Sequence, residues 1–194
     1  MSRKTKLLIS SALFISVLVI DQIIKIVVKT GMQLGEHIEV TSWFHIAFVE
    51  NNGMAFGWEL FGGKLILTLF RLVAVSVIGW FIWREIMRRR PTGYIICLTL
   101  IMAGAAGNII DCLFYGLIFS ESTYDAVATL GSYAPFMQGK VVDMFYFPLW
   151  TWPDWVPGLG GRIFFEPVFN FADSCVTCGA IYLILFHWKF FAKE

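Results

Sequence analysis

Residues 7–28 read LLISSALFISVLVIDQIIKIVV, and this stretch decides the fold because it is apolar and long enough to cross a bilayer. A helix needs about 20 apolar residues to span the hydrocarbon core. Basic residues precede the stretch, as in a secretory signal peptide, but no small-x-small cleavage site ends it and it continues through Asp21 and Lys25. We therefore expect an uncleaved first membrane helix.

Three further apolar stretches follow, and together the four predict spans at residues 7–28, 64–83, 94–113 and 171–190. The composition agrees, because 58% of the 194 residues are hydrophobic and 15% are charged, against about 45–50% and about 25% in soluble domains. The net charge of +1 creates no overall field that would attract nucleic acid. We predict a single membrane domain over residues 1–194.

Basic residues gather before the first span, between the second and third spans, and after the fourth. Because cytoplasmic loops carry an excess of lysine and arginine, both termini should be cytoplasmic and residues 30–63 and 114–170 external. Alternation in residues 38–49 predicts a small external sheet. Aromatic residues within 146–155 predict an interfacial segment, and residues 117–139 a surface loop. The expected fold class is an all-α membrane protein with four transmembrane helices, a small external β-sheet and an interfacial aromatic segment.

Polar side chains in the predicted spans concentrate near the outer ends of those spans. Charged groups within a span are costly and usually face the protein interior or a watery cavity. The residues at this depth are Asp21, Lys25, Asn108, Asp111, Asn170 and Asp173, with Asp143 just outside the membrane. Their common depth predicts a functional site at the outer leaflet.

Several of these residues also have a simpler interpretation. Asp21 and Lys25 are four residues apart, so an intrahelical ion pair explains them equally well. Asn170 and Asp173 have the spacing of a helix cap and its third-position partner. Asp143, taken alone, fits a solvated loop acid.

Together, the carboxylates and amides at this depth exceed what caps and ion pairs require. Two carboxylates close together share a proton, so that one is ionised and the other neutral. The ionised group can act as a general base on water, and the neutral one can polarise a carbonyl or protonate a leaving amine. Such a pair hydrolyses an amide without a cofactor or metal. His37, His45 and His187 lie too far apart in sequence to suggest a metal set, and Arg71 either pairs with an acid or extends to the interface.

Five short motifs occur in order along the chain: Asp21-Gln22-x-x-Lys25, Asn51-Asn52-Gly53-Met54-Ala55-Phe56, Gly107-Asn108-x-x-Asp111, Val141-Val142-Asp143 and Phe169-Asn170-x-Ala172-Asp173-Ser174. Each motif alone is weak. In this order on four predicted spans, they make nearly the whole chain resemble the bacterial lipoprotein signal peptidases, also called signal peptidase II.

The resemblance implies an aspartyl endopeptidase that removes the signal peptide from diacylglyceryl-modified prolipoproteins, cleaving just before the lipidated cysteine. By motif position, Asp143 and Asp173 are the implied catalytic pair. Supporting and cleft-forming roles are implied for Asn51, Gly53, Asn108, Asp111, Asn170, Asp21 and Lys25. The implied location is the bacterial inner membrane, with the site at the periplasmic face and with prolipoproteins and membrane lipids as partners. We expect a monomer.

One departure from the family pattern lies directly after the acid of the third span. The family usually has arginine there, and this chain has Cys112. A thiol cannot supply the forked donors of a guanidinium. Lys140 or Arg162 is a candidate substitute. Cys112 and Cys175 are predicted to lie near the same depth, where the sequence allows either a disulfide or two free thiols.

A second departure is length, because residues 112–142 put 31 residues between two motif acids where the family usually has a short turn. The extra residues fall within 117–139, which either cap the site or contact a partner.

Two other classes of protein compete with the peptidase. A proton-coupled transporter also places acids in its spans, but it generally has a site near the midplane and internal repeats, and we find no repeat. A thiol oxidoreductase requires reactive cysteines in the external segments, and the predicted external segments of this chain contain none. Cys175 and Cys178 form a CxxC within an apolar run, where we interpret them as small buried or lipid-facing residues.

Overall fold

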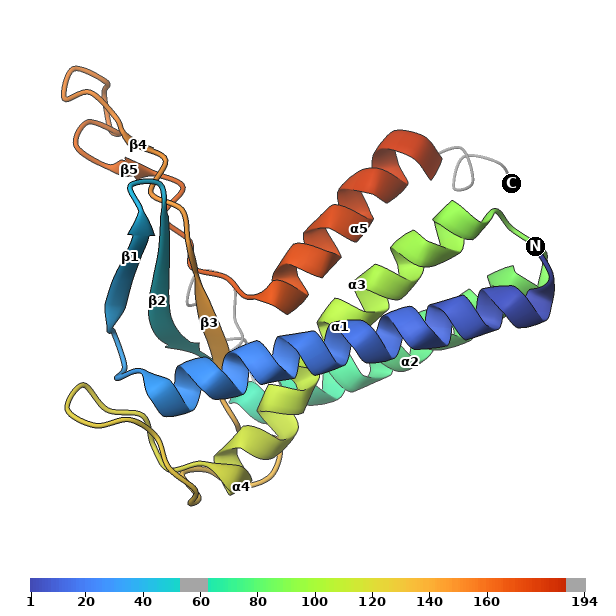
Figure 1. Cartoon of the computed structure of the whole chain (residues 1–194), viewed down its shortest axis with the longest axis horizontal. Coiled ribbons are helices and arrows are strands. Elements are labelled where there is room, and N and C mark those ends of the chain that lie inside the picture. Colours follow the sequence, from blue (N-terminus) through green and yellow to red (C-terminus); the bar gives the residue numbers. More distant parts are fainter. Residues whose placement is uncertain (53–62, 188–194) are drawn as a thin grey trace.

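The computed structural model describes residues 1–52 and 63–187, and long helices dominate it (Figure 1). Its main helices are α1 (Arg3–Gly31), α2 (Gly63–Met87), α3 (Thr92–Ile110) and α5 (Phe171–His187). The third helix continues through a π-helical turn, η2 (Asp111–Tyr115), into α4 (Gly116–Ile118). Three helical runs are long and apolar enough to cross a membrane: Arg3–Gly31, Gly63–Met87 and Thr92–Ile118.

The spans run further than the apolar pattern predicts, because charged residues continue the helices at their ends. Glu85 illustrates this: it is 2% exposed in the last turns of α2, where the guanidinium groups of Arg84 and Arg90 lie 3.2 and 3.0 Å from its carboxylate. The fourth span, predicted to end at residue 190, is seen as the 17-residue helix α5, and its last three predicted residues lie outside the described part of the chain.

Small residues let α3 pack closely against its neighbours. A Cβ atom added to Gly104 would lie 2.3 Å from the backbone oxygen of Ala172, at the start of α5. One added to Gly107 would lie 2.6 Å from Asp21 Oδ2 on α1. Only glycine therefore fits at these two positions, and α3 forms the centre of the helix bundle.

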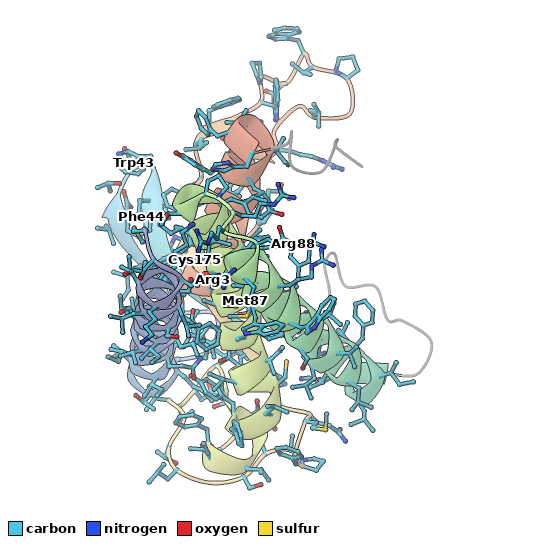
Figure 2. The ribbon with its side chains drawn as sticks, turned by 90° about the vertical axis from the view of Figure 1, so that its right-hand side faces the viewer. Arg3, Trp43, Phe44, Met87, Arg88 and Cys175 are labelled. Atoms are coloured by element: carbon cyan, nitrogen blue, oxygen red, sulfur yellow. The ribbon has the colours of Figure 1, made fainter. Side chains whose placement is uncertain are left out.

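The predicted small sheet is confirmed. It comprises β1 (His37–Thr41), β2 (Phe44–Asn51) and β3 (Val141–Tyr146), all antiparallel in that order. The register places Val49 opposite Asp143 and Glu50 opposite Val142. The sheet stands at one end of the helices, with Trp43 and Phe44 at the tip of the β1–β2 hairpin (Figures 1 and 2). Phe48 and Val142 join residues from α1 and η2 in one hydrophobic core cluster.

The aromatic segment forms a second hairpin of β4 (Trp150–Thr151) and β5 (Ile163–Phe164). The rings of Trp150 and Phe164 stack with their centroids 3.9 Å apart. Trp155, near its tip, is 81% exposed. An exposed, aromatic-rich hairpin fits the interfacial position predicted for this segment.

At the other end of the bundle, the N-terminus packs on the link between α2 and α3. Arg3 Nη2 donates a hydrogen bond of 2.8 Å to the backbone oxygen of Met87, and Figure 2 shows these two residues beside Arg88. The ammonium group of Lys6 donates to the backbone oxygen of Arg90. Two of the three basic regions therefore share one end of the bundle, opposite the sheet, as the orientation argument requires.

Residues 117–139 were predicted to be a surface loop, and most of them are exposed, but part of the segment is helical or buried. Residues 117 and 118 belong to α4, and Phe119 is 4% exposed within the core cluster between helix and sheet. Ser120 N donates a 2.8 Å hydrogen bond to the backbone oxygen of Thr129, so the segment folds back on itself. Tyr124, by contrast, is 74% exposed. The sequence hid this division because the residues after Phe119 are mostly small or polar, so no apolar pattern marks which of them are buried.

Candidate active site

The site begins with two charged residues on one face of α1, Asp21 and Lys25, and a third at the start of η2, Asp111, each fully buried. Lys25 Nζ lies 2.9 Å from Asp21 Oδ2 and 2.8 Å from Asp111 Oδ2. The intrahelical pair considered from the sequence is therefore present, and the same ammonium group also ties α1 to the end of α3. Removing charges from water is costly unless they are paired, which explains why one lysine is placed between two acids.

Gln22 lies inside the first motif and also hydrogen-bonds to Asp111. The sequence predicted no role for it. Its Nε2 donates to Asp111 Oδ1 at 2.9 Å, and its Oε1 accepts from the hydroxyl of Tyr115 at 3.1 Å. The other oxygen of Asp21 accepts from Ala172 N at 2.9 Å. An amide within a membrane span needs hydrogen-bond partners, and that requirement was the available signal for Gln22.

Two asparagine amides continue the network from Lys25 to both predicted catalytic acids. Lys25 Nζ donates to Asn108 Oδ1 at 2.8 Å, and Asn108 Nδ2 donates to Asp173 Oδ1 at 2.7 Å. Asn170 Nδ2 donates to Asp143 Oδ1 at 2.7 Å and to Asn108 Oδ1 at 3.0 Å. Residues from α1, α3, β3 and α5 thus meet in one hydrogen-bonded set.

Asn170 and Asp173 also form the helix cap considered from the sequence. Asp173 N donates to Asn170 Oδ1 at 2.9 Å, while Asn170 N donates to Asp173 Oδ2 at 3.3 Å. These reciprocal bonds follow the pattern of a capping box at the start of α5. The cap fixes the Asp173 side chain and leaves it in contact with Asn108.

Asp143 is not a solvated loop acid, because it lies within β3 and is 4% exposed. Burial raises the pKa of its carboxyl, the nearby charge of Asp173 raises it further, and hydrogen bonds from Asn170 and Asn51 only partly oppose this, so that the pKa reaches about 7. Asn51 is the last residue of β2. Gly53, the other site residue predicted from this motif, lies outside the described residues.

An apolar cavity of about 570 Å³ opens beside Asp173. Phenylalanines of the sheet and of the segment before α5 line one side, including Phe147, Phe165 and Phe169. Thr177 and Cys178 of α5 line the other side. Asp173 therefore lies between the polar network and a cavity suited to an apolar group.

Arg71 is the basic residue that contacts Cys112, which stands where the family usually has arginine. Its Nη1 donates to Cys112 Sγ at 3.5 Å, across from α2 to η2. Lys140, one of the substitutes considered from the sequence, instead pairs with Glu50 and Glu121 at 3.3 and 3.4 Å. Cys112 forms no disulfide with Cys175, since all four cysteines are free.

The strands bring together two histidines that are eight positions apart in sequence. His37 Nε2 and His45 Nδ1 are in hydrogen-bond contact on adjacent strands, with ring centroids 4.5 Å apart. The two rings therefore meet in the fold, although the spacing of the histidines in sequence suggested no metal set. Within residues 1–52 and 63–187, no three His, Cys, Asp or Glu side chains gather in a group that could hold a metal ion.

Comparisons with known proteins find related sequences and solved structures of the same fold. A lipoprotein signal peptidase of Porphyromonas gingivalis is 50% identical over 184 residues, covering 90% of this chain and 80% of that protein. One from Amoebophilus asiaticus is 36% identical over 177 residues, covering 86% and 72%. A solved bacterial membrane enzyme shares the fold with a TM-score of 0.64 at 23% identity, covering 93% of this chain and 87% of its own. The family model for signal peptidase (SPase) II matches residues 13–189, and the chain therefore belongs to the signal peptidase II family.

Proposed function

We propose that this chain is an aspartic endopeptidase that removes signal peptides from lipid-modified prolipoproteins, with Asp143 and Asp173 as its catalytic pair. The observation that carries the proposal is the shared network in which Asn170 donates to Asp143 and Asn108 donates to Asp173, each at 2.7 Å. Family membership and the names of the curated relatives support lipoprotein signal-peptide cleavage.

The two acids have different surroundings, and this difference assigns their roles. Both oxygens of Asp173 accept hydrogen bonds, from Asn108 Nδ2 and from the backbone N–H of Asn170, and the side chain also borders the apolar cavity where a substrate can lie. Asp143 is buried in β3 with its pKa raised to about 7, which favours the protonated acid below neutral pH. Asp173 is therefore the general base and Asp143 the general acid.

Hydrolysis then proceeds in two steps. In the first, Asp173 takes a proton from water as the water oxygen bonds to the scissile carbonyl carbon, and Asp143 gives its proton to the carbonyl oxygen. In the second, the C–N bond breaks as Asp173 protonates the departing nitrogen, and one hydroxyl of the tetrahedral diol gives its proton to Asp143 as the C=O bond of the new carboxylic acid forms. Both acids recover their starting states, and the amide has gained one water.

The apolar cavity supports a lipid-modified substrate. It borders Asp173 and is lined mainly by phenylalanine, so an acyl chain or apolar signal residue can lie next to the carboxylate. The network also lies toward the sheet end of the bundle, opposite the basic N-terminal end. By the positive-inside rule, this arrangement supports cytoplasmic termini and an active site at the outer face of the bacterial inner membrane, accessible to a substrate within the bilayer. The working unit is a monomer in this proposal.

The test uses purified protein in detergent with a diacylglyceryl-modified prolipoprotein peptide and an unlipidated peptide of the same sequence. Wild type is compared with Asp143→Asn, Asp173→Asn and a matched control, Asp125→Asn, which changes an exposed acid at the tip of 117–139. A chelator is added in a parallel series. We expect chelator-resistant cleavage of the lipidated peptide by wild type and control, and a loss of at least about 10³-fold in each site variant.

Each other result identifies the error. Full activity in Asp143→Asn or Asp173→Asn would exclude that residue from the catalytic pair. Loss of activity with the chelator would exclude a mechanism that depends on the two acids alone. Equal cleavage of both peptides would refute lipid recognition.

A further inference from the structure

A second buried ion pair lies about one helical turn beyond the catalytic network on α1. Lys29 Nζ lies 2.5 Å from Glu50 Oε1, and the two side chains are 0% and 3% exposed. Lys29 belongs to the last turns of α1 and Glu50 to β2. The mechanism proposed above uses neither residue, although burying both charges is costly unless further polar groups complete their hydrogen bonding.

Residues 117–139 supply those groups. The hydroxyl of Ser122, 3% exposed, accepts from Lys29 Nζ at 2.9 Å and donates to Glu50 Oε1 at 2.8 Å. One side chain thus bonds to both ions. Burial alone would raise the pKa of the Glu50 carboxyl, but the hydrogen bond and charge of Lys29, with the bond from Ser122, lower it below its ordinary value.

Aromatic residues of the same segment surround the cations. Lys29 Nζ lies 5.6 Å from the ring centre of Phe119 and 5.0 Å from that of Tyr133, distances at which a cation is attracted to a ring face. The hydroxyl of Tyr133 accepts a 2.6 Å hydrogen bond from the backbone N–H of Lys140, which leads directly into β3. The ammonium group of Lys140 in turn lies 3.3 Å from Glu50 Oε2.

This cluster is attached to the strands that carry Asp143. Glu50 is opposite Val142, and its neighbours on β2 flank the acid: Val49 is opposite Asp143, and Asn51 hydrogen-bonds its side chain. A displacement of β2 relative to β3 here would move Asp143 with respect to Asp173. Misplacement of a catalytic group by about 1 Å can cost about 10²-fold in rate.

We propose that residues 117–139 act as a brace for the active site, in which Ser122 holds the Lys29–Glu50 ion pair and so fixes β2 against β3 beside Asp143. Ser122 is thus a positioning residue and does not touch the reacting atoms. The inference rests on the proposed function in taking Asp143 as catalytic. It assigns a role to the extra length that separates this chain from the usual family pattern.

The experiment compares Ser122→Ala with Ser122→Thr, which restores a hydroxyl, and with Thr129→Ala. Thr129 is a matched control because it is an exposed hydroxyl on the same segment outside the cluster. Two experiments are made on each protein. The first measures kcat and KM with the lipidated peptide, and the second measures backbone hydrogen–deuterium exchange of peptides covering 46–51 and 141–146. The exchange measurement does not depend on catalysis.

We expect Ser122→Ala to lower kcat about tenfold with KM unchanged, and to speed exchange in β2 and β3 while α3 and α5 exchange as in wild type. Ser122→Thr should recover most of both losses, and Thr129→Ala should match wild type. If Ser122→Ala keeps the kcat and the exchange rates of wild type, the proposal that residues 117–139 act as a brace is refuted. Faster exchange throughout the helices would also refute it, since that indicates general destabilisation. If wild type cleaves nothing, the proposed function fails, and the exchange result alone decides whether Ser122 holds the strands.

Discussion

Replacing Asp143 by asparagine should stabilise the protein at neutral pH while abolishing cleavage. The carboxyl pKa is raised from 3.8 to about 7 in the folded chain, chiefly by burial and next by the charge of Asp173. In the unfolded chain the group titrates near its ordinary value, so between about pH 4 and pH 7 the folded state holds the extra proton and stability falls as pH rises. At 1.36 kcal/mol per pKa unit, the full cost above pH 7 is on the order of 4 kcal/mol.

Asparagine removes that cost because it is nearly isosteric and never ionises. Its side-chain oxygen can still accept the hydrogen bond that Asn170 Nδ2 makes to Asp143 Oδ1. The stabilisation of Asp143→Asn over wild type should therefore be small at pH 4.5 and grow through pH 7, reaching a plateau near pH 8. Asp125→Asn, at an exposed acid, should show no such growth.

Thermal unfolding of the three proteins in one detergent, at half-unit steps from pH 4.5 to pH 8, measures this difference directly. A variant that is less stable than wild type at pH 8 would refute the assignment of Asp143 as a buried acid kept neutral by its site. A constant difference at all pH values would show that asparagine acts through packing and not through ionisation.

Three further predictions concern the same network. Asp173→Asn should lose cleavage but only up to about 1 kcal/mol of stability, since asparagine keeps part of the α5 cap, as unfolding and activity assays on one preparation will show. Lys25→Met should destabilise the fold by about 3–5 kcal/mol by leaving Asp21 and Asp111 buried without their cation, and wild-type thermal stability would contradict this. Because the active form has Asp143 protonated, kcat/KM for the lipidated peptide should fall as pH rises through about 7, and activity still rising at pH 9 would reverse the assignment of acid and base.

The sequence predicted those parts of the fold that depend on composition along the chain. Apolar length located the helices, alternation located the sheet, and the common depth of the polar residues brought together Asp143, Asp173, Asn108 and Asn170. These features are local or additive, so they can be read without knowing which side chains meet.

Pairings across the fold could not be predicted, because they depend on the rotation of each helix and the register of each strand. Arg71 is 41 positions from Cys112, yet the two are in contact. Lys29 and Ser122 are 93 positions apart and belong to segments with no shared pattern. The sequence could show that a buried lysine needs partners but not that a serine in a polar insertion supplies one.

A helix cap at Asp173 and an ion pair at Lys25 do not exclude the proposed catalytic role of the network. The direction of the hydrogen bonds explains why. Lysine only donates, so Lys25 compels Asn108 to present its oxygen toward α1 and its NH2 group toward Asp173. Asp173 must then accept, and its second oxygen accepts from the N-cap backbone in the same way. The structural lysine and the helix cap thus both direct N–H donors at the carboxyl oxygens of Asp173. Burial and the neighbouring charge of Asp173 together raise the pKa of Asp143. In the proposed mechanism, the contacts that hold the helices together therefore also position the base, Asp173, and the proton donor, Asp143.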